Sequence, residues 1–82
     1  MQYRVEIEKP ALKFIAKQPK PQRERLFSAI YALPGTGDIK PLVGYKGVYR
    51  LRVGDYRVIY TLNNDILLVT VVSVGNRGDV YK

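Results

Sequence analysis

Near its start the chain alternates strictly between apolar and polar positions. Tyr3, Val5 and Ile7 are each followed by a charged residue. Because side chains along a strand point alternately to its two faces, this pattern predicts a first strand over residues 3–8, with the three apolar side chains directed inward.

The apolar spacing then changes to that of amphipathic helices. Pro10 suits the first turn of a helix, and the apolar residues that follow it form a single stripe. Two prolines within residues 18–21 end this helix, and Pro21 can open a second one, which ends near residue 33. The two stripes are Ala11, Leu12, Phe14 and Ile15 in the first helix and Leu26, Phe27, Ala29, Ile30 and Leu33 in the second.

Residues 48–60 predict a β-hairpin. Two runs rich in β-branched and aromatic residues flank Gly54-Asp55, a dipeptide typical of two-residue hairpin turns. This turn sets the register, because it decides which residues stand opposite each other. The expected cross-strand pairs are Val53 with Tyr56, Arg52 with Arg57, and Arg50 with Ile59.

Alternation along this hairpin gathers three arginines, Arg50, Arg52 and Arg57, on one face. Like charges directly opposite each other weaken a strand pair by roughly 0.2–1 kcal/mol, and the sequence shows no obvious structural gain that offsets this cost. An anion would supply the missing negative charge, so the arginines are the main candidate functional residues. The other face is apolar and comprises Tyr49, Leu51, Val53, Tyr56, Val58 and Tyr60.

The segments on either side of the hairpin complete the expected sheet. Residues 34–46 hold three Gly and two Pro and predict a loop. Residues 63–65, Asn-Asn-Asp, predict a turn of two or three residues. Residues 66–74 predict a long central strand that is covered on both faces. A one-residue slip at the turn would swap the two faces of that strand.

The predicted element order is β-α-α-β-β-β. It corresponds to an α+β fold in which two N-terminal helices pack on a mainly antiparallel sheet. With 82 residues, the chain is expected to form one domain over residues 1–82.

The charge of the chain points to an anionic partner. Fourteen Lys and Arg against seven Asp and Glu give a formal net charge of +7, which attracts RNA, DNA or an acidic protein. Scattered lysines on a soluble basic domain would produce the same total. The positions of the arginines favour a partner, because four of the seven lie between residues 50 and 77, within the predicted sheet and just after it.

The residues that are missing from the chain narrow the chemistry. It has no Cys, which excludes disulfide frameworks and zinc ribbons, and no His, the usual acid–base residue and a common metal ligand. No metal or cofactor is therefore expected. No apolar run approaches the roughly 18 residues that span a membrane, so a cytoplasmic protein without a membrane partner is expected.

Three segments resemble a known toxin family. They are residues 42–44, Leu-Val-Gly, residues 49–60, Tyr-Arg-Leu-Arg-Val-Gly-Asp-Tyr-Arg-Val-Ile-Tyr, and residues 74–81, Val-Gly-Asn-Arg-Gly-Asp-Val-Tyr. Together with the element order, they resemble the RelE branch of the RelE/ParE toxin superfamily over nearly the whole chain. The third segment resembles the ribonuclease branch more than the gyrase-poisoning ParE branch.

This resemblance implies the toxin of a type II toxin–antitoxin system. Such toxins enter the ribosomal A site and cut the mRNA there, which halts translation. A RelB-like antitoxin wraps and silences them, so a toxin–antitoxin hetero-oligomer is expected. The RNA-cleaving positions of the family fall on Arg50 and Arg52 in the second strand and on Arg57 in the third. Arg77 matches the arginine after the fourth strand, and Tyr81 the tyrosine near the C-terminus.

RNA cleavage by its own 2′-hydroxyl needs an aligned nucleophile, a stabilised pentacoordinate phosphate and a leaving 5′-oxygen. Without His, positioning and electrostatic stabilisation are the available means. Arginine is suited to electrostatic stabilisation, because its planar fork donates two parallel hydrogen bonds to phosphate oxygens. We expect Arg57 and Arg77 to clamp the phosphate. Arg50 and Arg52 would hold neighbouring phosphates or the reacting oxygens, and Tyr81 would stack on a base or orient the 2′-hydroxyl.

Two further residues are candidate contacts to the RNA backbone, Lys46 and Lys82. One departure from the family concerns Arg50 and Arg52, where relatives often carry lysine. Arginine keeps the positive charge but does not give up its proton, so it is a poor proton carrier.

Other interpretations stay open at the level of sequence. The chain could be a ParE-like inhibitor of DNA gyrase, or a basic RNA- or protein-binding module without activity. Single residues also have plainer interpretations. These are solvated outer-face positions for Arg50 and Arg52, an ion pair with Asp55 or Asp79 for Arg57, a loop charge for Arg77 and a packing residue for Tyr81.

Overall fold

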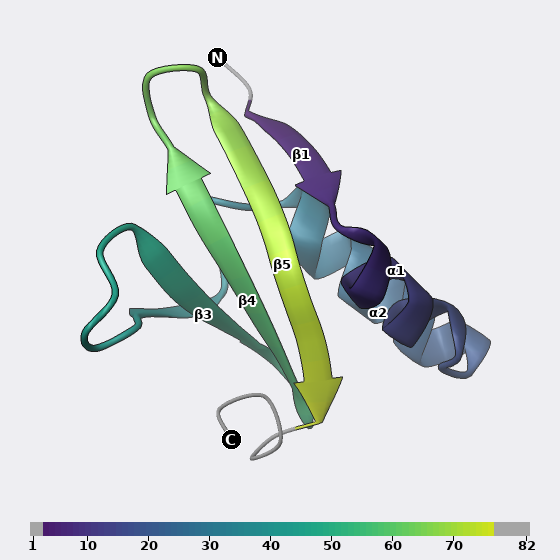
Figure 1. The fold of residues 1–82 in the computed structure, drawn as a ribbon. Helices are drawn as coiled ribbons and strands as arrows, with labels where there is room; N and C mark the ends of the chain where they lie inside the picture. Colours follow the sequence, from purple (N-terminus) through teal and green to yellow (C-terminus); the bar gives the residue numbers. More distant parts are fainter. Residues whose placement is uncertain (1–2, 77–82) are drawn as a thin grey trace.

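A twisted sheet with both helices on one of its faces makes up the part of the chain described by the computed structural model, residues 3–76 (Figure 1). The elements in chain order are β1 (Arg4–Ile7), α1 (Lys9–Ala16), α2 (Lys20–Tyr31), β2 (Asp38–Pro41), β3 (Val48–Val53), β4 (Tyr56–Asn63) and β5 (Leu68–Asn76). Neither of the two helices described has the length and apolar content needed to cross a membrane.

The strands of the described chain form one sheet in the order β1-β5-β4-β3-β2. β1 pairs parallel with β5, and every other neighbouring pair is antiparallel. The α+β class, the two N-terminal helices and the mainly antiparallel sheet are thus confirmed. The hairpin register is also confirmed, since Val53 stands opposite Tyr56 in β3 and β4.

The expected loop over residues 34–46 contains a strand, β2, which the sequence did not predict. β2 is four residues long and pairs with β3 along one side only, at the edge of the sheet. An edge strand needs one partner and tolerates a proline such as Pro41. Ile39 is its one apolar residue besides the proline, so the segment is too short to show a clear alternation.

The turn before β5 is longer than expected. Residues 64–67 form it, and Asn63 closes it by accepting hydrogen bonds through Oδ1 from the backbone N–H groups of Asp65 (3.0 Å) and Ile66 (3.2 Å). β5 therefore begins at Leu68, two residues later than expected.

The last strand is central, as expected, because β5 lies between β1 and β4. The expectation that it is covered on both faces is wrong for the described chain: both helices lie on one side of the sheet, and Val72 on β5 is 37% exposed. Ile59 pairs with Ser73 and Tyr60 pairs with Val71, so Val72 has no opposite residue. This β-bulge swaps the faces of β5 midway along the strand.

The core lies between the helices and the inner face of the sheet. The apolar stripes of α1 and α2 supply Ala11, Ile15, Leu26 and Ile30, each 1% exposed or less. The sheet supplies the apolar face predicted for the hairpin, together with Val69 and Val71. The fully buried side chains with the largest volumes are Tyr60, Ile15, Leu26, Ile30, Leu51, Val58, Val69 and Val71. Tyr3, Val5 and Ile7 pack against this core, as the first alternation predicted.

Candidate functional site

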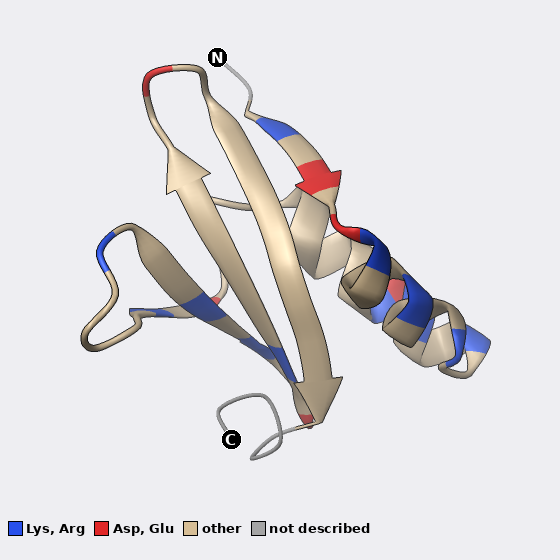
Figure 2. Ribbon diagram, viewed as in Figure 1, with Lys and Arg blue, Asp and Glu red and all other residues tan. Residues whose placement is uncertain are grey.

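The strand register places Arg50, Arg52 and Arg57 on the sheet face opposite to the buried side chains and the helices, which we call the arginine face. Figure 2 marks basic positions along β3. The strand register aligns this face in two rows that run across β2, β3, β4 and β5. The first row is Asp38, Arg52, Arg57 and Gly75, and the second is Lys40, Arg50, Ile59 and Ser73. The predicted gathering of the three hairpin arginines is therefore confirmed.

Arg52 and Arg57 stand directly opposite each other on β3 and β4. Arg52 is exposed and Arg57 is half-buried. Two adjacent guanidinium groups repel each other across the strand pair, at a cost of roughly 0.2–1 kcal/mol. A phosphate placed between them would replace that repulsion with charge-assisted hydrogen bonds.

The β-bulge in β5 decides what lies beside Arg57. With the bulge, Arg57 pairs with Gly75, which has no side chain. Had the ladder continued from Tyr60 and Val71 without the bulge, Val74 would take that position and its isopropyl group would lie against the guanidinium. The bulge thus directs Val74 into the core, where it is 6% exposed, and places no side chain opposite Arg57 on the arginine face.

Arg50 differs from the other two arginines. It is 9% exposed, and its Nη2 lies 3.5 Å from Oδ1 of Asp38 on β2. A nearly buried guanidinium needs a partner because an unpaired buried charge is strongly unfavourable. Asp38 supplies this partner, so the Arg50 side chain is held in place by an ion pair with the neighbouring strand.

Sequence reasoning missed Asp38 and Lys40, because it assigned their segment to a loop. Both belong to the arginine face through the pairing of β2 with β3. The available signal was the single apolar residue Ile39 between two charged residues, which is compatible with a short edge strand.

The other predicted residues are placed less centrally or lie beyond the described chain. Lys46 is exposed in residues 42–47, the connection between β2 and β3. Arg77, Tyr81 and Lys82 lie outside the described residues, so their roles stay predictions.

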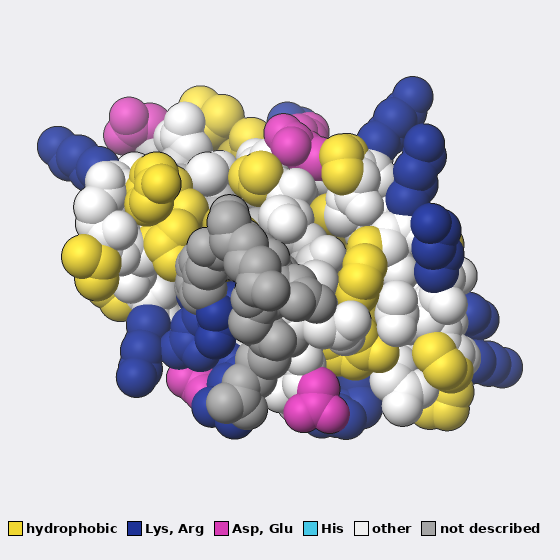
Figure 3. All heavy atoms as spheres, turned by 60° about the horizontal axis from the view of Figure 1, so that its bottom comes forward, with side chains coloured by type: hydrophobic (Ala, Val, Ile, Leu, Met, Phe, Trp, Pro, Cys, Tyr) yellow, Lys and Arg dark blue, Asp and Glu magenta, His cyan; other side chains and the backbone are white. Residues whose placement is uncertain are grey.

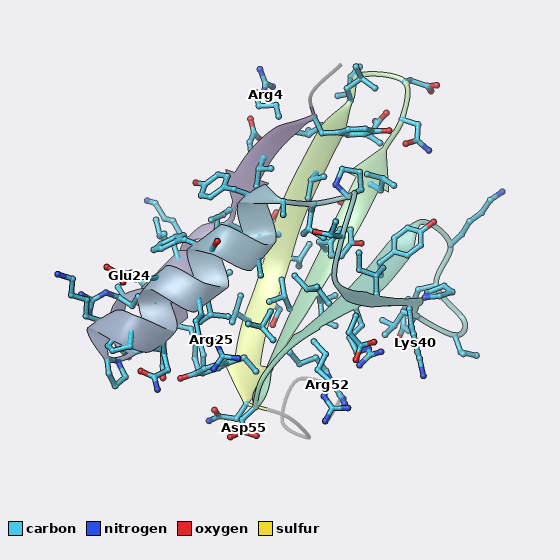
Figure 4. The ribbon with its side chains drawn as sticks, turned by 180° about the vertical axis from the view of Figure 1, so that it is seen from behind. Arg4, Glu24, Arg25, Lys40, Arg52 and Asp55 are labelled. Carbon is cyan, nitrogen blue, oxygen red and sulfur yellow. The ribbon has the colours of Figure 1, made fainter. Side chains whose placement is uncertain are left out.

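Contacts with the helices hold the turn end of the arginine-bearing hairpin. The Tyr56 hydroxyl donates a hydrogen bond to Oε1 of Gln18, at 2.9 Å, and the Tyr56 ring meets Phe14 edge to face, with centroids 6.0 Å apart. Figure 4 shows Arg25 of α2 near the end of the hairpin that carries Asp55. These contacts come from the side of the sheet opposite to the arginines, so they anchor the hairpin without occupying the site.

The inner face of the hairpin stays uncharged. The rings of Tyr49 and Tyr60 stack across β3 and β4, with centroids 5.6 Å apart. Burial, and to a lesser extent the neighbouring Tyr49, raises the pKa of Tyr60 above its ordinary value. Tyr60 is therefore neutral at physiological pH, and the charge of the hairpin lies on its outer face.

The sequence matches the family model described as "ParE toxin of type II toxin-antitoxin system, parDE" over residues 5–81. This chain belongs to the RelE/ParE toxin family. It is also 31% identical over 88 aligned residues to "Putative toxin RelE1" of Methanocaldococcus jannaschii, and the match covers 100% of this chain and 98% of that relative. The chain is accordingly a RelE-like toxin of a type II toxin–antitoxin system.

Solved structures of RelE toxins have the same fold. The toxin–antitoxin complex RelE-RelB of Pyrococcus horikoshii contains a chain with a TM-score of 0.79 and 32% identity, covering 96% of this chain and 99% of that one. The isolated RelE toxin of E. coli gives a TM-score of 0.75 and 27% identity, with 96% of this chain and 90% of that one covered. The resemblance to the RelE branch is thereby confirmed.

Proposed function

We propose that this RelE-like toxin is an endoribonuclease that cuts mRNA in the ribosomal A site without a metal. The observation that carries the proposal is the juxtaposition of Arg52 and Arg57 beside Gly75 on the outer face of the sheet. Two adjacent guanidinium groups offer several N–H donors to the oxygens of a phosphodiester, and Gly75 adds no side chain beside them.

In the proposed reaction the 2′-hydroxyl of the mRNA attacks the adjacent phosphorus, and the bond to the 5′-oxygen breaks. Arg52 and Arg57 stabilise the added negative charge of the pentacoordinate phosphate. One preorganised donor is commonly worth about 3–4 kcal/mol in such a transition state. The ribosome aligns the mRNA, which is why a site built from charges alone can act there.

Arg50 takes a supporting role in this proposal. Its pairing with Asp38 and its small exposed fraction suit a residue that fixes the local charge rather than one that moves onto a substrate. The predicted roles of Arg77 as a second clamp and of Tyr81 at the 2′-hydroxyl are part of the same proposal. Lys46 and Lys82 contact the RNA backbone in it.

A RelB-like antitoxin is the proposed protein partner, in a toxin–antitoxin hetero-oligomer. The support comes from relatives: solved structures similar to this chain include RelE in complex with RelB from Pyrococcus horikoshii, and with RelB from Methanococcus jannaschii at 29% identity. An antitoxin that neutralises the arginine face would remove the charge on which the proposed cleavage depends.

The test uses purified ribosomes that carry a defined mRNA and an empty A site. The unmutated toxin is expected to cut the mRNA within the A-site codon, and Arg57→Ala is expected to lower the rate at least 100-fold, because one transition-state donor is lost. Arg4→Ala is the matched control, since Arg4 is an exposed cation on β1 whose ion partner is Glu6. Intact mRNA with the unmutated toxin would contradict the proposal.

Inhibition of DNA gyrase is the second candidate function. The observation that favours it is the matching family model, whose description names the ParE toxin. A supercoiling assay with purified gyrase separates the two candidates. Under the proposed function gyrase stays active in the presence of the toxin while programmed ribosomes lose their mRNA, and the reverse result would favour the gyrase inhibitor.

A further inference from the structure

A second basic surface lies on the helical layer, on the side of the sheet opposite to the arginine face. Lys9 and Lys13 belong to α1, and Lys17, its C-terminal cap, continues the same four-residue spacing. All three are exposed. Residues four apart lie on one side of a helix, so these ammonium groups form a line, which we call the lysine row. In Figure 3 basic side chains follow the right edge of the molecule, where Figure 1 places the helices.

The lysine row has no negatively charged partner among the described residues. Like charges four residues apart destabilise a helix, and a cation at its first residue opposes the helix dipole. The first turn of α1 has no acidic residue, and within residues 3–76 no carboxylate lies at ion-pair distance from Lys9, Lys13 or Lys17. Residues 9–31 contain six basic residues and one acidic residue, Glu24. Lys13 in the last turn and Lys17 at the C-cap interact favourably with the helix dipole, but no described carboxylate pairs with the row, and an external polyanion would supply that negative charge.

The surroundings of the row indicate which polyanion fits. A helix that binds a membrane surface inserts its apolar face, but the apolar face of α1 is already in the core, with Ala11 at 1% and Ile15 at 0% exposure. A protein partner would need apolar contact area, and lysine is depleted in protein–protein interfaces. Beside the row, the apolar contact area that α1 offers to a partner is small, because Leu12 is its one large exposed apolar side chain, with an exposed fraction of 43%.

A nucleic-acid backbone matches the row better. Four residues of helix rise about 6 Å, so neighbouring charges in the row are about 6 Å apart along the helix axis and the whole row spans about 12 Å. This spacing is similar to that of consecutive phosphates along one strand. The ammonium group of lysine is a hydrated point charge that accepts many phosphate geometries, whereas the arginine fork is suited to one.

We propose that the lysine row binds the phosphate backbone of folded ribosomal RNA while the arginine face holds the mRNA. The inference rests on the proposed function, because it takes the ribosome as the site of action. The two basic surfaces lie on opposite sides of the sheet. One RNA strand therefore does not need to reach both, and the protein can sit between the mRNA and the wall of the cleft that contains it.

The test measures binding of the toxin to purified programmed ribosomes with an empty A site, as a function of salt. Replacing Lys9, Lys13 and Lys17 together by Gln is expected to weaken binding by about fivefold per lysine at 0.1 M salt, on the order of 100-fold in total. The slope of log affinity against log salt should fall by about two to three units. The loss should appear in the ribosome concentration at half-maximal cleavage rather than in the maximal rate.

Two controls distinguish the effect of the net charge of the protein from the effect of where the charge lies. Replacing the same three lysines by Arg keeps the charge and should restore binding. Lys13→Gln and Arg4→Gln change the net charge equally, and only the first should lower affinity for the ribosome. The Gln variants should remain folded, because they relieve repulsion on an exposed helix face.

The outcomes distinguish this inference from the proposed function. If the triple Gln variant binds ribosomes like the unmutated toxin, the lysine row is not an RNA contact, whether or not mRNA is cut. Binding that depends on the row without any mRNA cleavage would uphold the row and overturn the nuclease. No ribosome binding by the unmutated toxin would overturn both. Loss of antitoxin affinity alone in the triple variant would assign the row to the antitoxin and overturn the RNA assignment.

Discussion

The arginine face and the lysine row carry the same sign of charge but are built differently. Strand register positions Arg50 and Arg57. Arg50 is 9% exposed and paired with Asp38, and Arg57 is half-buried. The lysines stand exposed on a helix without ion partners among the described residues. Under the two proposals, positive charge serves two purposes: guanidinium groups held in place suit a transition state of defined shape, and exposed ammonium groups suit attachment to a backbone of variable shape.

Exchanging arginine for lysine on one surface and lysine for arginine on the other should have unequal effects. Arg57→Lys keeps the charge but removes the planar fork, so cleavage on saturating programmed ribosomes should fall by about 100-fold. The exchange of all three lysines of the row for Arg should leave ribosome affinity within about threefold. Quantitative primer extension on the cut mRNA and ribosome binding measure the two effects. Equal tolerance on both surfaces would contradict the distinction.

Removing the partner of Arg50 should test how firmly the arginine face is held. Asp38→Ala leaves a guanidinium of small exposed fraction without its carboxylate, and the free energy of unfolding should fall by about 1 kcal/mol, since Asp38 itself is half exposed. Urea denaturation followed by tyrosine fluorescence measures this change. Glu6→Ala, which removes the carboxylate of an exposed ion pair with Arg4, is the control and should change stability by less.

The anchor at the turn end of the hairpin should contribute a similar or smaller amount. Tyr56→Phe keeps the edge contact with Phe14 but removes the hydrogen bond to Gln18, so the free energy of unfolding should fall by about 0.5–1 kcal/mol. Cleavage should fall as well if this contact positions Arg57. A stability loss with full cleavage would show that the anchor serves the fold alone.

The smallest effect is expected from Tyr60 at alkaline pH. Because burial raises its pKa in the folded chain, the folded state holds the phenolic proton more tightly than the unfolded state. This contribution to stability is complete below the ordinary tyrosine pKa and is lost as the pH rises through the higher folded value. Tyr60→Phe should therefore flatten the loss of stability above about pH 10, measured by urea unfolding at several pH values. An unchanged alkaline slope would contradict this assignment.

The sequence was most informative where structure depends on near neighbours. The Gly54-Asp55 turn and the alternation around it were enough to place Arg50, Arg52 and Arg57 on one face, and the pairing of Arg52 with Arg57 is confirmed. The prolines likewise marked the separation of the two helices. Such features depend on dihedral preferences and on a period of two or 3.6 residues, which can be read in a few consecutive residues.

Features that depend on distant segments were not predictable. The long apolar run of residues 66–74 does not reveal where the ladder with β4 slips, so neither the bulge at Val72 nor the placement of Gly75 beside Arg57 was expected. Asp38 became a partner of Arg50 because an edge strand docks on β3. In both cases the competing registers differ little in local energy, and packing across the sheet selects one.

By itself, then, the sequence determined the two helices, the hairpin and the face on which its arginines lie, because these follow from local geometry. The tertiary structure alone decided that Gly75 borders Arg57, that Asp38 holds Arg50, and that the lysine row and the arginine face lie on opposite sides of one sheet. Those arrangements arise from burial of a shared core, which brings together residues that are far apart in the chain and carry no local sign of their contact.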